Sequence, residues 1–257
     1  MIDTLVVYGK WPFRRIEFDW IELLEKMDEN GVEKAMLFNV NGAFYRDAHE
    51  ANLELFEVLK KLPREVERRF IVMGVVNPIY PGWEHDLNFL LESGVRIVVL
   101  LPNYHGYSLK DPALSHFWRF ISTHDIIVSF VAKFEDPRQR HRLDANDLLE
   151  NDVIDLLRTY RNLKVILHNF GYSSSLSIYL SNPDHDHLFF DLNFFYEVPT
   201  GEPTKFVRIV GKDRVVFSSF YPFRYYKAGI MKLIETGIMD SRDFERKFRE
   251  ALKWDSK

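Results

Sequence analysis

The sequence predicts an α/β fold, a single (β/α)8 TIM barrel in which residues 1–257 form one domain. Eight short apolar runs alternate along the chain with segments whose apolar residues recur at helical spacing. Most of these runs are continuous rather than alternating, which indicates strands buried on both faces, as in parallel sheets. Eight such units in 257 residues match the usual size of this barrel.

The predicted strands are rich in β-branched and aromatic residues, and several are ended by Gly, Pro or Asn. In the first strand, four of the eight residues are β-branched, and Gly9 and Pro12 follow as stops. The strands are expected at residues 2–9, 34–40, 70–76, 95–101, 126–132, 163–168, 187–192 and 215–218.

The predicted helices have apolar residues three or four positions apart, together with capping or stop signals. Asp19 is expected to cap the first helix, which ends before Gly31. The others are expected at residues 47–62, 83–92, 112–123, 144–160, 176–180 and 203–210, with helical sequence from about residue 224 onward. A doubly wound open sheet is the main rival, but the chain contains neither Gly-x-Gly-x-x-Gly nor GxxxxGK[ST].

The composition excludes several classes of protein. Apolar residues make up 46% of the chain, including 22 Phe and 12 Tyr, which is enough for a large core. The net charge of −4 is spread along the sequence, so we expect no nucleic-acid or membrane partner. No apolar run is long enough for a transmembrane span, no leader is recognisable and there is no cysteine, so a cytoplasmic location is expected.

Polar residues gather where the predicted strands end, and in a barrel these ends form the active site. They are Asn39, Asn41, Asn77, Asn103, His105, Lys133, Glu135, Asp136, Arg138, His141, His168, Asn169, Asp191 and Asn193. A ligand pocket is predicted from five of them, namely Asn77, Asn103, His105, Arg138 and His141. Because a guanidinium can donate two parallel hydrogen bonds to a carboxylate, Arg138 favours a small carboxylated ligand. Alternatively, residues 135–141 form an ion-pair network that fixes a long loop.

Six motifs from residue 2 to about residue 233 carry a resemblance to a known family. They are Ile2-Asp3-Thr4, Asn77-Pro78, PNYHGY at 102–107, FEDPRQRH at 134–141, VILHNFG at 165–171 and VGKDRVVFSSFYPF at 210–223. Their order and spacing resemble the amidohydrolase superfamily, in particular the amidohydrolase-related branch that includes aminocarboxymuconate-semialdehyde decarboxylase and similar metal-dependent hydrolases.

The resemblance implies a metal site that this chain has largely lost. Family members are similar in having two His on the first strand, one His at the end of the fifth, one at the end of the sixth, and an Asp at the end of the eighth. Position by position, these fall at Leu5, Val7, Val131 (or its neighbour Phe130), His168 and Phe220. Leu, Val and Phe offer no lone pair, so no metal and no cofactor are expected. A relocated site made by His105, His141 and His168 is the alternative.

Three functions are compatible with these observations. The first is a noncatalytic amidohydrolase-like barrel that binds a small molecule, in which Leu5, Val7, Val131 and Phe220 form an apolar plug beside His168. The second is a metal-independent hydrolase or lyase with His168 as acid or base. The third is a scaffolding subunit that pairs with itself, because the C-terminal third is rich in aromatic residues that can form a homo-oligomer interface.

Overall fold

The structure, a computed structural model, describes residues 1–196, 200–239 and 245–253, and it contains the predicted ring of parallel strands. The strands are β1 (Ile2–Tyr8), β2 (Lys34–Asn39), β3 (Phe70–Val72), β4 (Gly74–Val75), β5 (Ile97–Leu100), β6 (Ile127–Val131), β7 (Lys164–His168) and β8 (Leu188–Phe190). They pair in the order β1-β2-β3 and β4-β5-β6-β7-β8. The predicted third strand is therefore present as two short pieces, β3 and β4, separated by Met73.

Residues 215–221 stand in the place of the predicted eighth strand and close the barrel without forming a regular strand. On one side, Val216 N donates to Phe190 O of β8 at 2.9 Å. On the other, Thr4 N donates to Phe217 O at 2.9 Å and Val7 N donates to Tyr221 O at 2.8 Å. These bonds join β8 to β1, so the predicted α/β barrel fold is confirmed.

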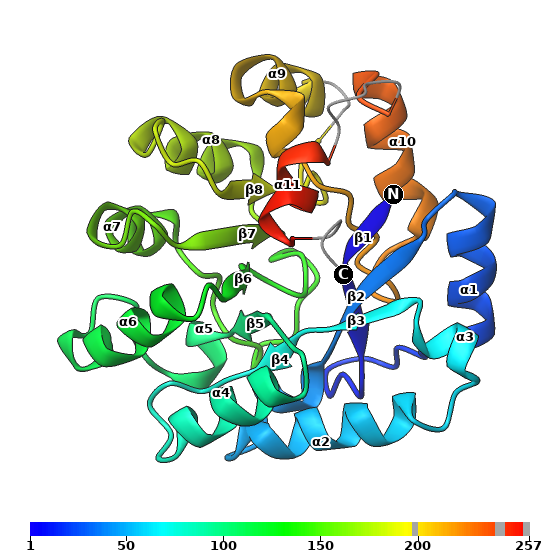
Figure 1. The fold of residues 1–257 in the computed structure, drawn as a ribbon. Coiled ribbons are helices and arrows are strands. Elements are labelled where there is room, and N and C mark those ends of the chain that lie inside the picture. The colour runs from blue at the N-terminus through cyan, green and yellow to red at the C-terminus, as the bar shows by residue number, and fades with distance from the viewer. Residues whose placement is uncertain (197–199, 240–244, 254–257) are drawn as a thin grey trace.

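Most of the helices form the outer layer around the strands (Figure 1). The helices are α1 (Trp20–Glu29), α2 (Ala48–Leu59), α3 (Arg64–Glu67), α4 (Trp83–Glu92), α5 (Pro102–His105), α6 (Ser115–Thr123), α7 (Glu150–Thr159), α8 (Tyr172–Ser181), α9 (Glu202–Val210), α10 (Tyr226–Thr236) and α11 (Arg246–Ala251). Three short 3-10 turns accompany them, namely η1 (Val40–Ala43), η2 (Pro112–Leu114) and η3 (Lys212–Arg214). Asp19 caps α1 as predicted, since its side chain accepts from the backbone N–H groups of Ile21 and Glu22.

Two helical predictions differ from the structure in length. The helix predicted from residue 144 begins only at Glu150, because side chains before it bond elsewhere. Asp144 accepts from the Tyr104 hydroxyl at 2.7 Å, and Asp147 pairs with Lys133 at 3.1 Å. The short helix predicted at 176–180 instead spans Tyr172–Ser181. Residues 240–244 and 254–257 of the predicted C-terminal helical segment lie outside the described residues.

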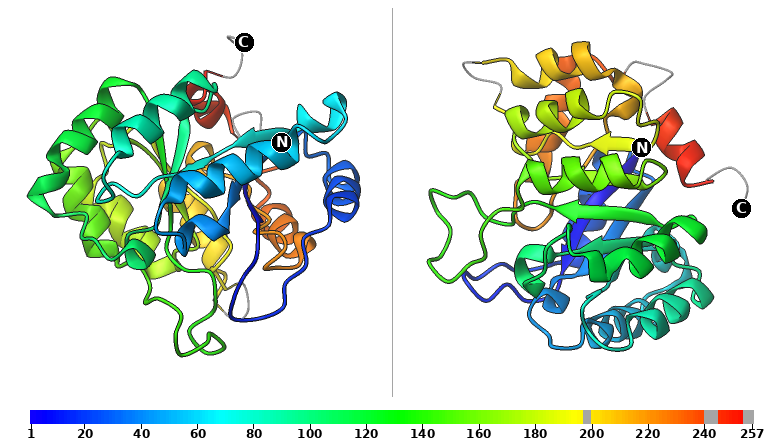
Figure 2. Two further views of the ribbon diagram at one scale, coloured as in Figure 1. Left: turned by 90° about the horizontal axis from the view of Figure 1, so that it is seen from below. Right: turned by 90° about the vertical axis from the view of Figure 1, so that its left-hand side faces the viewer.

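Alternate residues of each strand pack into two separate apolar layers, as the two-residue period of a strand requires. In β7, Ile166 belongs to the layer inside the barrel, whereas Val165 and Leu167 belong to the layer beneath the helices. One end of the interior is covered by α11 (Figure 1). The Phe248 ring of this helix lies 5.2 Å from the Phe189 ring. Loops near residues 9–19 and 133–149 project from the opposite end (Figure 2). Within the described ranges, no helix combines the length and hydropathy that crossing a bilayer requires.

Candidate functional site

His168 is the last residue of β7, and its side chain faces the barrel interior. It is in register with Val131 of β6, and it lies two residues after the inward-facing Ile166. The imidazole is fully buried, with Nδ1 at 3.3 Å from Asp191 Oδ2. Nε2 has no hydrogen-bond partner among the residues that the structure describes. The Asp191 carboxylate therefore holds the His168 ring through Nδ1 and leaves Nε2 out of this contact.

The Asp191 carboxylate follows β8 and is fixed by donors from three neighbouring segments. It accepts from the backbone N–H of Asn169 at 3.1 Å, from the Asn193 amide at 3.2 Å and from the Ser218 hydroxyl at 2.9 Å. All of these residues are buried. Asp191 therefore ties together the ends of β7, β8 and the segment that closes the barrel, and it positions the His168 ring.

Leu5, Val7, Val131 and Phe220 lie together in the apolar layer inside the barrel, the layer that His168 faces. Each is at most 2% exposed. The backbone joins two of them directly, since Phe220 N donates to Leu5 O at 3.0 Å. Their hydrocarbon surfaces fill the space and supply no ligand atom, so the residues present do not fit a catalytic metal.

The relocated metal site has no geometric basis either. His105 Nε2 bonds Gly42 O at 2.9 Å, and the His141 ring stacks on Phe13 at 5.3 Å, whereas His168 lies on the Asp191 carboxylate. Across residues 1–196, 200–239 and 245–253, no three His, Asp or Glu side chains are grouped so that they could hold a metal ion.

Phe220 has an unusual backbone conformation, with φ at +55°. A bulky residue in this left-handed region is an outlier, whereas Asp and Asn adopt it more readily. The backbone at this position therefore suits a short polar residue better than the phenylalanine that occupies it.

Aromatic rings cover the end of the barrel opposite α11 and form what we term the aromatic lid. Its members are Trp11, Phe13, Phe44, Tyr104, Phe134 and Phe223. Trp11 lies at the centre, 4.9 Å from the Phe134 ring and 5.2 Å from the Phe223 ring. Phe223 in turn stacks on Phe220 at 4.9 Å. The lid is thus continuous with the apolar interior and excludes solvent from His168.

Glu135 fastens the lid. Its buried carboxylate accepts from Trp11 Nε1 at 2.9 Å and from Arg14 Nε at 2.6 Å. Hydrogen bonds to a charged group are each worth about 1.5–3 kcal/mol. Two such bonds hold the loop near residues 9–19 across the barrel end.

Replacing Glu135 by Ala is expected to release this loop. The substitution removes both bonds, and the loss of even one corresponds to about a ten-fold or greater rise in the open fraction, so trypsin should cleave after Arg14 and Arg15 at least about ten-fold faster. The control is Glu57→Ala, since Glu57 pairs with Lys60 on the surface of α2 and lies outside the loop that is cleaved. Equal cleavage rates in E135A and the native protein would show that Glu135 does not fasten the loop.

Known proteins share this architecture at low sequence identity. No family model matches the chain, and no curated protein matches it. Among solved structures, 2,6-dihydroxybenzoate decarboxylase from Rhizobium matches with a TM-score of 0.67 at 13% identity, over 99% of this chain and 98% of that one. A probable 2-pyrone-4,6-dicarboxylic acid hydrolase from Acinetobacter baumannii has a TM-score of 0.65 at 14% identity, over 97% and 98%. A putative amidohydrolase from Staphylococcus aureus has a TM-score of 0.66 at 13% identity, over 98% and 100%.

The chain shares the barrel fold of these solved structures. The resemblance seen in the sequence is thereby confirmed for the architecture over nearly the whole chain. At these identities the match establishes the fold alone, and the chemistry of this chain has to be argued from its own side chains.

The five residues of the predicted ligand pocket are spread around the barrel end. Asn77 and His105 line one hollow of about 360 Å³, and Asn103 lines a second hollow of about 430 Å³. Arg138 lines neither hollow. It is exposed, and its guanidinium donates to the two carboxylate oxygens of Asp136 at 2.9 and 2.8 Å. His141 is exposed and lies against the lid through Phe13. The structure thus brings two of the five together.

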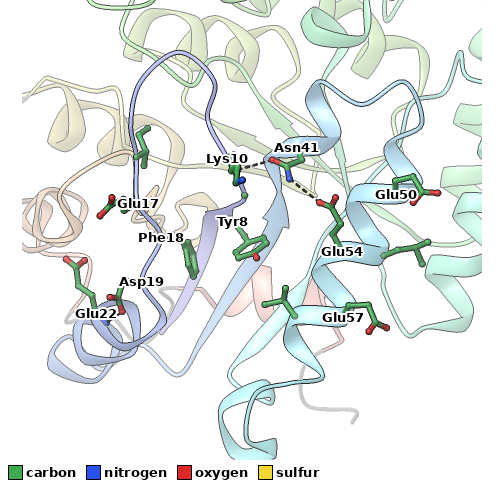
Figure 3. A pocket seen from close by; sticks show the side chains of 14 residues that line it. Tyr8, Lys10, Glu17, Phe18, Asp19, Glu22, Asn41, Glu50, Glu54 and Glu57 are labelled. Carbon is green, nitrogen blue, oxygen red and sulfur yellow. Dashed lines mark hydrogen bonds between the residues drawn. The ribbon is translucent and has the colours of Figure 1, made fainter.

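A larger hollow of about 940 Å³ lies outside the barrel, between the start of α1 and the side of α2 (Figure 3). Carboxylates dominate its lining, namely Glu17, Asp19, Glu22, Glu50, Glu54 and Glu57, with Lys10 as its basic residue. Glu54 is oriented by Asn41, whose amide donates to it at 3.0 Å (Figure 3). Like-charge repulsion makes this hollow unsuitable for a carboxylated ligand.

Sequence reasoning missed Trp11 and Arg46 as residues of the barrel end. Trp11 follows Gly9 at the end of the first strand, which is a position that lines the mouth in any such barrel. Arg46 lies several residues beyond the second strand. Counting the whole loop after that strand as part of the barrel end would have included Arg46.

Proposed function

We propose that this protein is an amidohydrolase-like barrel without metal-dependent hydrolase or decarboxylase activity. The observation that carries the proposal is the packing of Leu5, Val7, Val131 and Phe220 inside the barrel that His168 faces. A catalytic metal of this type needs about three nitrogen or oxygen ligands and an open position for water. At the five positions that correspond to the family's ligands, one imidazole is present, and the aromatic lid excludes water.

Metal analysis of the purified protein tests the proposal. After expression with added zinc and manganese, we expect far less than one equivalent of metal per chain, and the same content in His168→Asn. We also expect no turnover of a panel of aromatic carboxylates, amides, esters and lactones. One tightly held equivalent of metal, with turnover that a chelator abolishes, would contradict the proposal.

A metal-independent hydrolase or lyase at His168 is the second candidate, and the His168–Asp191 pair favours it. A carboxylate on Nδ1 leaves Nε2 available as general base or acid. The lid must move for a substrate to reach this nitrogen. Turnover that increases in Trp11→Ala and disappears in Trp11→Ala/His168→Asn would favour this candidate; no turnover in either variant would exclude it for that panel.

The scaffolding role, the homo-oligomer and the cytoplasmic location stay predictions. In the C-terminal third, Tyr225 is 91% exposed, and Ile234 and Met231 of α10 are about half exposed. These side chains are the apolar surface that such an interface would use. Light scattering after size-exclusion chromatography distinguishes a monomer from a dimer, and Ile234→Glu should dissociate a dimer that uses this face.

A further inference from the structure

The hollow of about 360 Å³ lies beside the aromatic lid, at the rim of the barrel. Its lining comes from the segments that follow β2, β4 and β5. The residues are Ala43, Phe44, Tyr45, Arg46, Asn77, Ile79, Tyr80, Tyr104 and His105. Two of them, Phe44 and Tyr104, also belong to the lid. Phe44, Arg46 and Ile79 of its lining are exposed, so the hollow is reached from solvent without any movement of the lid or of the sealed interior.

The hydroxyls of Tyr45 and Tyr104 and Nε2 of His105 are bonded within the protein, but three other polar groups of this hollow are donors without a protein partner among the described residues. No Asp or Glu lines it, and Arg46 is its one charged residue. Within the described part of the chain, no carboxylate or carbonyl accepts from the Arg46 guanidinium, the Tyr80 hydroxyl or the Asn77 side-chain amide nitrogen. Asn77 does use its oxygen, which accepts from Ile79 N at 3.3 Å. A hollow with unpaired donors, a positive charge and no carboxylate favours an anion.

The walls of the hollow are aromatic. The Phe44 and Tyr104 rings meet edge to face at 5.7 Å with an angle of 83° between their planes. The Tyr104 hydroxyl is turned to Asp144, to which it donates at 2.7 Å, so this tyrosine contributes its ring to the wall. Phe44 is 42% exposed, so part of its ring is open to a ligand in the hollow. Such a corner provides edge or stacking contacts for a planar apolar group.

Four other basic side chains around the barrel end are already paired with carboxylates. Arg138 forks Asp136, Arg14 binds Glu135, and Lys133 and Arg140 share Asp147. An incoming carboxylate would have to displace a protein carboxylate at each of these residues. At Arg46 the ligand carboxylate would have no protein carboxylate to displace.

We propose that this rim hollow binds a small aromatic carboxylate, with the carboxylate on Arg46 and the ring against Phe44 and Tyr104. Asn77 and Tyr80 supply the further donors. The site is separate from His168 and from the metal positions, so it does not depend on whether the barrel centre is catalytic.

Isothermal titration calorimetry with benzoate tests the inference, with neutral benzamide as the matched ligand. We expect saturable benzoate binding that weakens as salt is added, and at least ten-fold weaker binding of benzamide. Arg46→Gln should weaken benzoate binding about ten-fold or more, because it removes the charge and the fork. Arg138→Gln is the control, since it removes a guanidinium from the same end of the barrel but outside the hollow, and it should leave binding unchanged.

Three results would overturn the inference: no saturable binding of benzoate at millimolar concentration, equal binding of benzamide, or equal losses in R46Q and R138Q. Circular dichroism establishes that the variants are folded. Should R46Q fail to fold, Tyr80→Phe removes a single donor and is expected to weaken binding several-fold, and no change there would also overturn it. Because the readout is binding, neither metal content nor turnover affects the result.

Discussion

The combined substitution Leu5→His, Val7→His and Phe220→Asp is expected to unfold the protein unless zinc is supplied. It rebuilds three of the ligands that the family resemblance implies, beside the existing His168. Each replaced side chain is at most 2% exposed, and its burial contributes roughly 1.5–3 kcal/mol. Each new polar group that is buried without a partner costs about 1–3 kcal/mol more. The sum is comparable to the whole stability of a typical domain, about 5–15 kcal/mol.

Zinc should restore part of this loss, because metal binding to a folded site stabilises the folded state. The backbone of Phe220 favours the rebuilt site, since its φ of +55° suits Asp better than Phe. Urea unfolding with and without zinc is the measurement. The matched control keeps the interior apolar with Leu5→Met, Val7→Ile and Phe220→Leu, and it should remain folded with no response to zinc. A stably folded zinc-free triple variant would show that the interior does not depend on these hydrocarbon contacts.

The architecture could be predicted because it is encoded in local patterns. The apolar runs at β2, β6 and β7 and the Asp19 cap are signals within a few residues, and the structure contains each of them. The eighth strand was harder to predict. Its apolar run is present at residues 215–218, but Ser219 N donates to Asp3 and Phe220 turns into the left-handed region, so the ladder is broken.

The barrel end could be predicted only in part, because its contacts join distant segments. Trp11 bonds Glu135 across 124 residues, and no local pattern reveals that pairing. Asn77 and His105 meet in one hollow because both follow strand ends, which the barrel rule captures. Arg138 does not join this hollow, because it pairs with Asp136 only two residues away. This local ion pair agrees with the alternative prediction, in which residues 135–141 form an ion-pair network.

Asp3 is fully buried, and its ionisation is expected to make the stability of the protein depend on pH. Its Oδ1 accepts from Ser219 N at 2.9 Å and from Leu5 N at 3.3 Å. Burial outweighs these bonds and raises the pKa of Asp3 to about 7, compared with 3.8 for an exposed Asp. The folded protein therefore holds this proton between about pH 4 and pH 7, where the unfolded chain has released it.

The sign of the effect follows from this difference in proton binding. The folded state binds the proton more tightly, so the stabilisation is complete below about pH 4 and is lost progressively as the pH rises through 7. A pKa difference of this size corresponds to roughly 4 kcal/mol, at about 1.4 kcal/mol for each pH unit. Asp3→Asn removes the ionisation but retains an oxygen that can accept from Ser219 and Leu5.

Urea unfolding at pH 4.5, 6 and 8 measures the difference between the native protein and Asp3→Asn, so that other titrating groups cancel. We expect the native protein to lose stability relative to the variant across this range, by a few kcal/mol in total. Asp184→Asn, at an exposed carboxylate, is the control and should follow the native pH dependence. If the native protein and D3N change in parallel from pH 4.5 to 8, the Asp3 side chain is not the source of the dependence. The physical source of the effect is the packing of the first strand against residues 217–219, which excludes water from Asp3.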